Sequence, residues 1–227
     1  MVVYTKKGDT GETRLIDGSK VEKSSCQSVA VGELDALNCE IGSILCFRSE
    51  KFKNSRNNER KIFYDKQMEI LENIQTRIFE ISSIIANPKY STRTDVVFNP
   101  EHIKLLEDNI DSMEKMMPKI RNFILPQGNQ QMMTAHRARV ICRSTERNLT
   151  GLINSSGNNF IKINCSAYIN RLSDYLFTLV RYIGFYENIP ERKIVSHKEF
   201  QAEIEPVESQ INRDIAEATR RLLSDLV

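Results

Sequence analysis

Apolar residues recur at steps of three and four along most of this chain, which is the spacing that lines one face of an α-helix. The clearest stripe lies between residues 66 and 86 and ends at Asn87-Pro88, where proline cannot continue a helix. Its members are Leu71, Ile74, Ile78, Ile81 and Ile85. The pattern predicts a long helix that buries this stripe against a core.

A second stripe follows Asn99 and Pro100, which suit the N-cap and the first position of a helix. The stripe continues up to Pro118 and is rich in methionine, so we interpret it as core and not as a cofactor site. Its members are Ile103, Leu106, Ile110, Met113 and Met117.

Further helices are predicted over residues 30–47, 130–152 and 165–184, which gives five in all. Amphipathic helices bury their apolar stripes by packing on one another. The chain is therefore predicted to be all-α and to fold as a five-helix bundle.

Two segments fall outside this pattern. Residues 48–61 are basic and polar, which predicts a solvated insertion between the first two helices. Residues 188–227 repeat the helical spacing, with Pro206 as an expected kink. We therefore predict a domain over residues 1–187 followed by a C-terminal amphipathic helical extension.

Composition narrows the range of functions. A chain of 227 residues with 40% hydrophobic content can bury one good core. The net charge of +2 with 27% charged residues predicts no general surface for nucleic acid, so any anion site must be local. The apolar stretch 175–186 is too short to span a bilayer and contains Arg181, so no membrane partner is expected.

The five cysteines are odd in number and include no C-x-x-C pair. They predict neither a disulfide framework nor a zinc site, and they favour a reducing compartment. We expect a cytoplasmic protein, with the mitochondrial matrix as the alternative.

The first candidate site is the loop from Tyr4 to Thr13, which combines Gly8 and Gly11 with Lys6 and Lys7. Glycines let a ligand approach main-chain N–H groups closely, and lysines add positive charge, as an anionic phosphate chain requires. The alternative is that Gly-Asp-Thr-Gly forms only the turn of a β-hairpin.

The second candidate lies on the predicted helix around residues 136–147. At about 100° per residue, one face collects polar side chains while the neighbouring face is apolar. The polar members are Arg139, Arg143, Glu146 and Arg147. Guanidinium groups match phosphate oxygens, and a carboxylate can orient them. The alternative is an exposed face of intrahelical ion pairs, such as Arg143 with Glu146.

Six segments carry a resemblance to a known family. They are residues 4–13, 18–23, 30–38, 123–128, 136–147 and 168–177. In sequence and order they resemble motifs of the PduO-type cob(I)alamin adenosyltransferases, also called corrinoid adenosyltransferases. The first four are similar to the family's Y-T-K-x-G-D-x-G-x-T, G-x-R-V-x-K, A-Y-G-x-V-D-E-L-N and F-x-L-P-G-G.

This resemblance implies transfer of the 5′-deoxyadenosyl group of ATP to the cobalt of a reduced corrinoid, with release of triphosphate and formation of adenosylcobalamin. It implies a five-helix bundle of the ferritin-like up-and-down type, assembled as a homotrimer with the active site between subunits. ATP, Mg²⁺ and cobalamin are the implied ligands, with no dedicated metal ligands from the protein. A flavoprotein reductase and an adenosylcobalamin-dependent mutase are the implied partners.

The resemblance also implies roles for individual residues. Those expected to hold the ATP phosphates from one subunit are Thr5, Lys6, Gly8, Asp9, Gly11, Thr13 and Lys23. Those expected to hold the nucleotide from its neighbour are Arg143, Glu146 and Asn170. Asp35 would pair across the interface with Arg139, and Phe123 would exclude the lower ligand of the corrinoid cobalt.

The chain departs from the family at four positions, where Tyr, Glu, Gly and Arg are usual. They are Val31, Ala36, Gln127 and Ser144, respectively. These departures leave open a non-catalytic sensor or delivery protein of the same fold, although we predict retained catalysis. A ferritin-type metal protein is disfavoured because His102, His136 and His197 lack a Glu three residues before them.

Overall fold

The computed structural model describes residues 4, 6–48, 58–87, 98–156, 161–194, 206, 209–211 and 213–215. The chain divides into two compact units. The first comprises Met1–Lys119 and Pro126–Glu191, and the second comprises Ile120–Leu125 and Arg192–Val227. The helical bundle belongs to the first unit.

The first unit begins with a short antiparallel hairpin of β1 (Glu12–Arg14) and β2 (Lys20–Glu22). Its turn contains Gly18, whose φ of 85° few other residues adopt. The turn of the hairpin therefore lies at Asp17-Gly18, and the alternative that placed a hairpin turn at Gly-Asp-Thr-Gly is wrong because that segment precedes β1.

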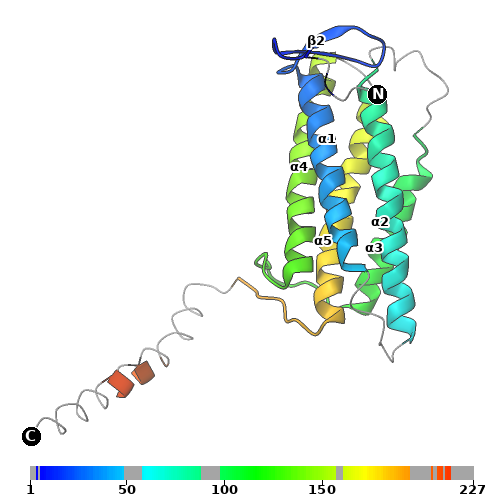
Figure 1. Ribbon diagram of the computed structural model, residues 1–227. Helices are drawn as coiled ribbons and strands as arrows, with labels where there is room; N and C mark the ends of the chain where they lie inside the picture. Colours follow the sequence, from blue (N-terminus) through cyan, green and yellow to red (C-terminus); the bar gives the residue numbers. More distant parts are fainter. Residues whose placement is uncertain are drawn as a thin grey trace, which may run out of the picture. The chain divides into compact units, whose positions relative to one another are not determined.

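Within the described part of the first unit, five α-helices follow the hairpin (Figure 1). They are α1 (Cys26–Leu45), α2 (Asn58–Ile85), α3 (Glu101–Met116), α4 (Gln130–Ser156) and α5 (Ala167–Tyr186). A 3₁₀ turn, η1 (Cys46–Arg48), extends α1, and a π-helical turn, η3 (Ile161–Ser166), precedes α5. The prediction of a mainly helical chain is confirmed.

Helices α1 and α4 are antiparallel, as their side-chain contacts show. Thr145 of α4 donates to the carbonyl of Glu33 in α1, and Arg137 pairs with Glu40 further along α1. Helix α5 lies between α3 and α4 and is buried along most of its length, so it forms the centre of the bundle. Apolar side chains from all five helices form one continuous core.

The stripe predicted over residues 66–86 is buried. Leu71, Ile74, Ile78, Ile81 and Ile85 of α2 are each at most 1% exposed. One group of polar side chains within the core is paired, since Gln67 donates to Asn109 and accepts from Tyr175 across three helices. Such a buried network favours one register of the helices over its alternatives.

Several predicted boundaries change. Helix α2 begins at Asn58, so the solvated insertion predicted over residues 48–61 is wrong at both ends, because Arg48 closes η1. The N-cap of α3 is Pro100 and not the predicted Asn99, although the side-chain oxygen of Asn99 accepts a bond of 2.9 Å from the Glu101 amide. The helix is assigned from Glu101, one residue after the predicted first position.

Little of the C-terminal extension is described. Residues 206, 209–211 and 213–215 have helical backbone, and Ile211 and Ile215 are exposed. The rest of the predicted amphipathic stripe lies outside the described residues. Among the helices that the structure describes, none is long and apolar enough to cross a membrane.

Candidate functional site

The N-terminal loop folds back onto the hairpin. The Lys23 amide donates to the carbonyl of Gly11 at 2.9 Å, and Gly11 has a φ of 89°, in the left-handed region that favours glycine. The Ile16 amide donates to the carbonyl of Ala86 at 3.2 Å, which attaches the hairpin to the C-terminal end of α2. The loop is thus fixed at the end of the bundle where α1 begins (Figure 1).

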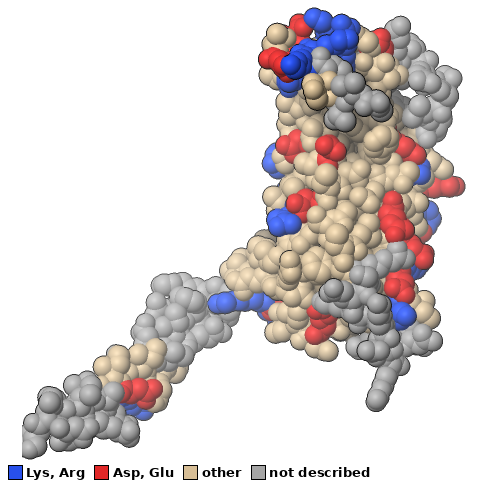
Figure 2. Space-filling model, in the orientation of Figure 1, with Lys and Arg blue, Asp and Glu red and all other residues tan. Residues whose placement is uncertain are grey.

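A cleft of about 510 Å³ lies along this loop and hairpin. Its lining residues are Lys7, Gly8, Glu12, Thr13, Arg14 and Lys20. Figure 2 shows Lys and Arg side chains gathered at this end of the molecule. A cleft with three cations, a glycine and a hydroxyl has the composition that polyphosphate binding requires.

Arg14 and Lys20 were missed by the sequence prediction. They face each other across the hairpin, because β1 and β2 pair Arg14 with Lys20. Lys20 also forms an ion pair with Glu12 at 2.6 Å, and Arg14 donates to the carbonyl of Gly18 at 3.0 Å. Alternation of charged residues on either side of Asp17-Gly18 was the signal that could have revealed them.

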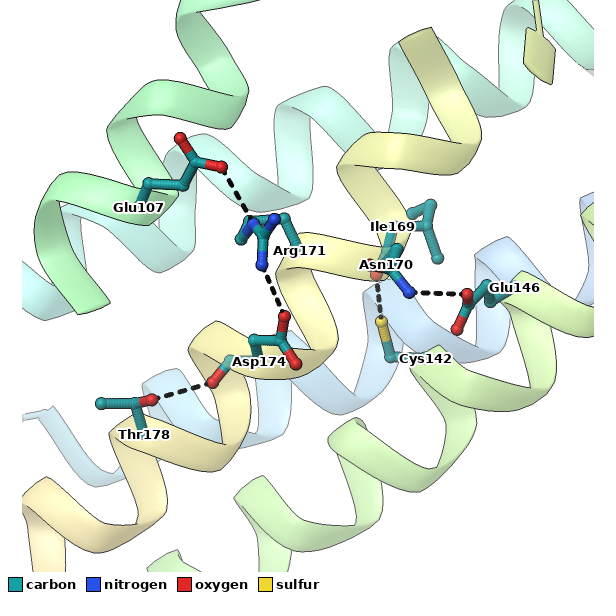
Figure 3. Close-up of polar contacts among 8 residues, drawn as sticks. All are labelled: Glu107, Cys142, Glu146, Ile169, Asn170, Arg171, Asp174 and Thr178. Carbon is teal, nitrogen blue, oxygen red and sulfur yellow. Dashed lines mark hydrogen bonds and ion pairs between the residues drawn. The ribbon is translucent and has the colours of Figure 1, made fainter. Parts of the chain in front are cut away.

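The polar face predicted on α4 is present. Arg143 and Arg147 are exposed, while Arg139 and Glu146 are half-buried. Glu146 accepts a hydrogen bond of 2.7 Å from the Asn170 amide group of α5 (Figure 3). The alternative of an ion pair between Arg143 and Glu146 is therefore wrong, since among the described residues Arg143 has no carboxylate partner and Glu146 is held by Asn170.

Arg139 is held differently from Arg143. Its Nε atom is buried without a hydrogen-bond partner within the described chain. Burial, and then the neighbouring charge of Arg143, lower the pKa of Arg139. A buried donor without a partner is costly, so this group fits an acceptor supplied from outside the described residues.

His136 lies one turn before Arg139 and was not predicted as a special residue. Its ring is buried and its Nδ1 atom has no partner among the described residues. Burial, followed by the charge of Arg139, lowers the pKa of His136 to about 4. The ring is therefore neutral at physiological pH.

Asp35 is exposed on α1 and lines a groove of about 210 Å³ between α1 and α2. Gly32, Asn38 and Phe79 share this groove, and Phe79 is 68% exposed. No ion pair joins Asp35 to Arg139 within the described chain. The structure thus leaves both members of the predicted interface pair available.

Phe123 lies in the second unit. There the Leu125 amide donates to Arg192 and the Ile194 amide donates to Phe123, both at 2.8 Å. The Phe123 side chain is 84% exposed. Core packing, the ordinary role of a phenylalanine, is therefore excluded within the described chain.

Of the predicted site residues, Glu146 and Asn170 are hydrogen-bonded to each other, and Gly8 and Thr13 line the cleft beside the hairpin. Lys6, Asp9, Gly11 and Lys23 belong to the same loop or directly follow the hairpin, and Thr5 lies outside the described residues. Among the described residues there is no group of three or more His, Cys, Asp or Glu that could hold a metal ion.

The chain is similar in sequence to proteins of one known family. A family model described as cobalamin adenosyltransferase matches residues 3–183. The corrinoid adenosyltransferase MMAB of Bos taurus is 31% identical over 194 residues, which cover 84% of this chain and 74% of the relative. The corrinoid adenosyltransferase of Bacillus subtilis (strain 168) is 33% identical over 184 residues, covering 81% and 87%.

Solved structures agree with the sequence relatives. A variant of the PduO-type ATP:corrinoid adenosyltransferase from Lactobacillus reuteri, complexed with cobalamin and ATP, is similar with a TM-score of 0.73 and 30% identity. The similarity covers 85% of this chain and 96% of that chain. A further variant of the same enzyme, also complexed with cobalamin and ATP, has a TM-score of 0.72.

Proposed function

The chain belongs to the cobalamin adenosyltransferase family, and from this premise we propose that it is an ATP:corrinoid adenosyltransferase. In the proposed reaction, cobalt in the +1 state attacks C5′ of ATP. A cobalt–carbon bond forms, the C5′–oxygen bond breaks, and triphosphate leaves with the bonding electrons. The observation that carries this proposal is that the family model matches residues 3–183, a span that contains the loop, the α4 face and Asn170.

The protein's part in this reaction is positioning and charge neutralisation. Reduced cobalt is itself a strong nucleophile, so no catalytic base is required. The protein must hold C5′ in line with the cobalt and stabilise negative charge that accumulates on the departing triphosphate. We assign the phosphate chain to the cleft with Lys7, Arg14 and Lys20, and to Arg143.

We propose that Mg²⁺ arrives with the triphosphate. The described residues offer no three-ligand metal group, but Glu12 contributes a carboxylate to the cleft. This fits Mg²⁺, which keeps several waters and is commonly bound through one or two carboxylates together with substrate phosphates. The ion would add positive charge beside the leaving group.

We further propose a homotrimer of ferritin-like up-and-down bundles, with each site shared by two subunits. Asp35 is exposed in a groove of α1 and α2, and the buried Nε atom of Arg139 has no partner within the described chain. Pairing of Asp35 with Arg139 of a second copy would satisfy both groups. The same arrangement would bring the loop of one subunit to Arg143, Glu146 and Asn170 of the other.

Phe123 is proposed to cover the lower face of the corrinoid. An axial ligand stabilises the more oxidised cobalt, so an apolar side chain that keeps this position empty makes reduction to the +1 state easier. The 84% exposure of Phe123 supports this role, because the ring has an open face to offer to a ligand.

The deciding experiment incubates the purified protein with ATP and chemically reduced cobalamin and follows the absorption spectrum of adenosylcobalamin. We expect multiple turnovers. A non-catalytic binding protein, which the departures at Ala36 and Ser144 favour, would bind ATP in calorimetry and form no product. Ser144→Arg, which restores the family's usual residue, is the matched variant, and it should strengthen ATP binding if this departure weakens it.

A further inference from the structure

Arg181 is a charged residue in α5, the helix that is buried along most of its length. Its side chain is only 4% exposed. Its Nε atom donates to Glu191 at 2.6 Å, and its Nη2 atom donates to the carbonyl of Pro118 at 2.7 Å. Burying a guanidinium group is costly unless it is paired, so two short bonds in different directions indicate a specific role for its fork of donors.

Both acceptors lie where the chain leaves the first unit. Pro118 stands two residues before Ile120–Leu125, and Glu191 directly precedes Arg192. These are the two segments from which the described core of the second unit is built. Arg181 therefore ties together the two points from which both segments depart.

Beyond those points the two segments pair with each other. Ile124 and Lys193 form an antiparallel bridge, flanked by the bond from Leu125 to Arg192 and the bond from Ile194 to Phe123. Phe123 therefore lies in a strand pair whose two starting points are both fixed by one buried arginine. The two backbone hydrogen bonds of so short a pair are weak alone, because fixing the chain costs about 1–2 kcal/mol per residue.

We propose that Arg181 is a positioning residue for Phe123: by holding Pro118 and Glu191 together, it keeps the two segments paired and so fixes the backbone that presents the ring. The effect of Arg181 on the use of the corrinoid rests on the proposed function. Its effect on the pairing of the two segments does not depend on that function.

The first test measures amide hydrogen exchange of the full chain. In Arg181→Lys the shorter ammonium cannot reach both acceptors, so exchange at Leu125 and Ile194 should become about tenfold faster while α1 and α4 amides keep their rates. Arg171→Lys is the matched control on the same helix. Arg171 also bonds two partners, Glu107 and Asp174 (Figure 3), but its side chain is 37% exposed.

Unchanged exchange at Leu125 and Ile194 would overturn the proposal, as would equal acceleration throughout the bundle. Should Arg181→Lys fail to fold, Glu191→Gln gives the same test, because it removes one charged bond and keeps the side-chain shape. This arm needs no catalytic activity, so it is independent of whether the proposed function holds.

The second test separates the two substrates in turnover assays. Arg181→Lys should lower kcat/KM for the reduced corrinoid by about tenfold and leave the Kd for ATP within about twofold, because only the Phe123 segment is displaced. In a Phe123→Ala background the same substitution should add no further loss. Independent, additive losses would show that Arg181 does not act through Phe123. Absence of turnover in the wild-type protein would instead refute the proposed function, and with it the corrinoid consequence.

Discussion

Helix α4 has two faces, and they differ in whether their polar groups have hydrogen-bond partners within the described chain. The inner face comprises Ala138, Cys142, Thr145 and Leu149, all of which are 0% exposed. The outer face comprises Arg139, Arg143, Glu146 and Arg147. On the inner face the Cys142 thiol donates to Ile169 and the Thr145 hydroxyl donates to Ile141. On the outer face the buried Nε atom of Arg139 has no partner in the described chain.

The difference separates folding from function along one helix. Groups of the inner face find their partners within the chain, so changes there should appear in the free energy of unfolding. Groups of the outer face include strong donors that the described residues leave unpaired, and in the proposed function a nucleotide or a second subunit supplies their acceptors. Changes there should appear in activity.

The largest effect is expected for Arg143→Ala on the outer face. Loss of a cation beside the departing triphosphate should lower turnover about 10³-fold, which corresponds to about 4 kcal/mol of transition-state stabilisation. The bundle should stay folded, because Arg143 is exposed and lies off the apolar stripe. Turnover and the circular dichroism melting curve of the same sample check this. Loss of the folded state would show that the role of Arg143 is structural.

Leu149→Ala tests the inner face. The residue is 0% exposed, and truncating such a side chain costs about 3 kcal/mol through lost burial and a residual cavity. Urea unfolding should show this loss, while turnover of the protein that remains folded at 25 °C stays within about twofold of the wild type. A large loss of activity without loss of stability would contradict the division into two faces.

His136 sharpens the comparison because it is buried yet incompletely paired. Burial and then Arg139 lower its folded-state pKa to about 4, below the ordinary value of 6.5. The unfolded chain therefore takes up a proton first as the pH falls below 6.5, so the stability that the neutral ring provides is present above pH 6.5 and is lost progressively towards pH 4.

Wild-type protein should lose about 2 kcal/mol more than His136→Gln across this pH interval, because glutamine does not titrate. Urea unfolding at several pH values measures the difference between the two proteins, which cancels the titration of carboxylates common to both. Parallel stability curves would mean that the folded-state pKa of His136 is ordinary.

The inner face of α4 could be predicted from sequence, since helical periodicity places its members together wherever the helix packs. The residues of the outer face could also be predicted from sequence, but their hydrogen-bond partners could not. Asn170 lies on α5, and its bond to Glu146 depends on how two helices far apart in sequence are aligned. The resemblance supplied both residues as nucleotide ligands, and that role stays a prediction.

Other features depended on tertiary contacts that no local pattern shows. Residues 58–61 are polar and lie outside the apolar stripe, yet they form the first turn of α2. Arg181 looked only like an interruption of an apolar stretch, because its acceptors at Pro118 and Glu191 come together only in the fold. The groove beside Asp35 likewise required α1 and α2 to be adjacent.

The smallest effect is expected for Arg137→Ala, which compares two arginines of α4 that lie six positions apart. Arg137 is 62% exposed and pairs with Glu40 of α1 at 3.1 Å, whereas Arg143 has no ion pair among the described residues. An exposed pair of this kind contributes about 0.5 kcal/mol, and salt screens it. Urea unfolding should therefore show a small loss at low ionic strength that disappears in 1 M NaCl (a Debye length of about 3 Å), with turnover unchanged. If Arg137→Ala instead reduced turnover as strongly as Arg143→Ala, charge anywhere on α4 would suffice, and the outer face would not be a specific site.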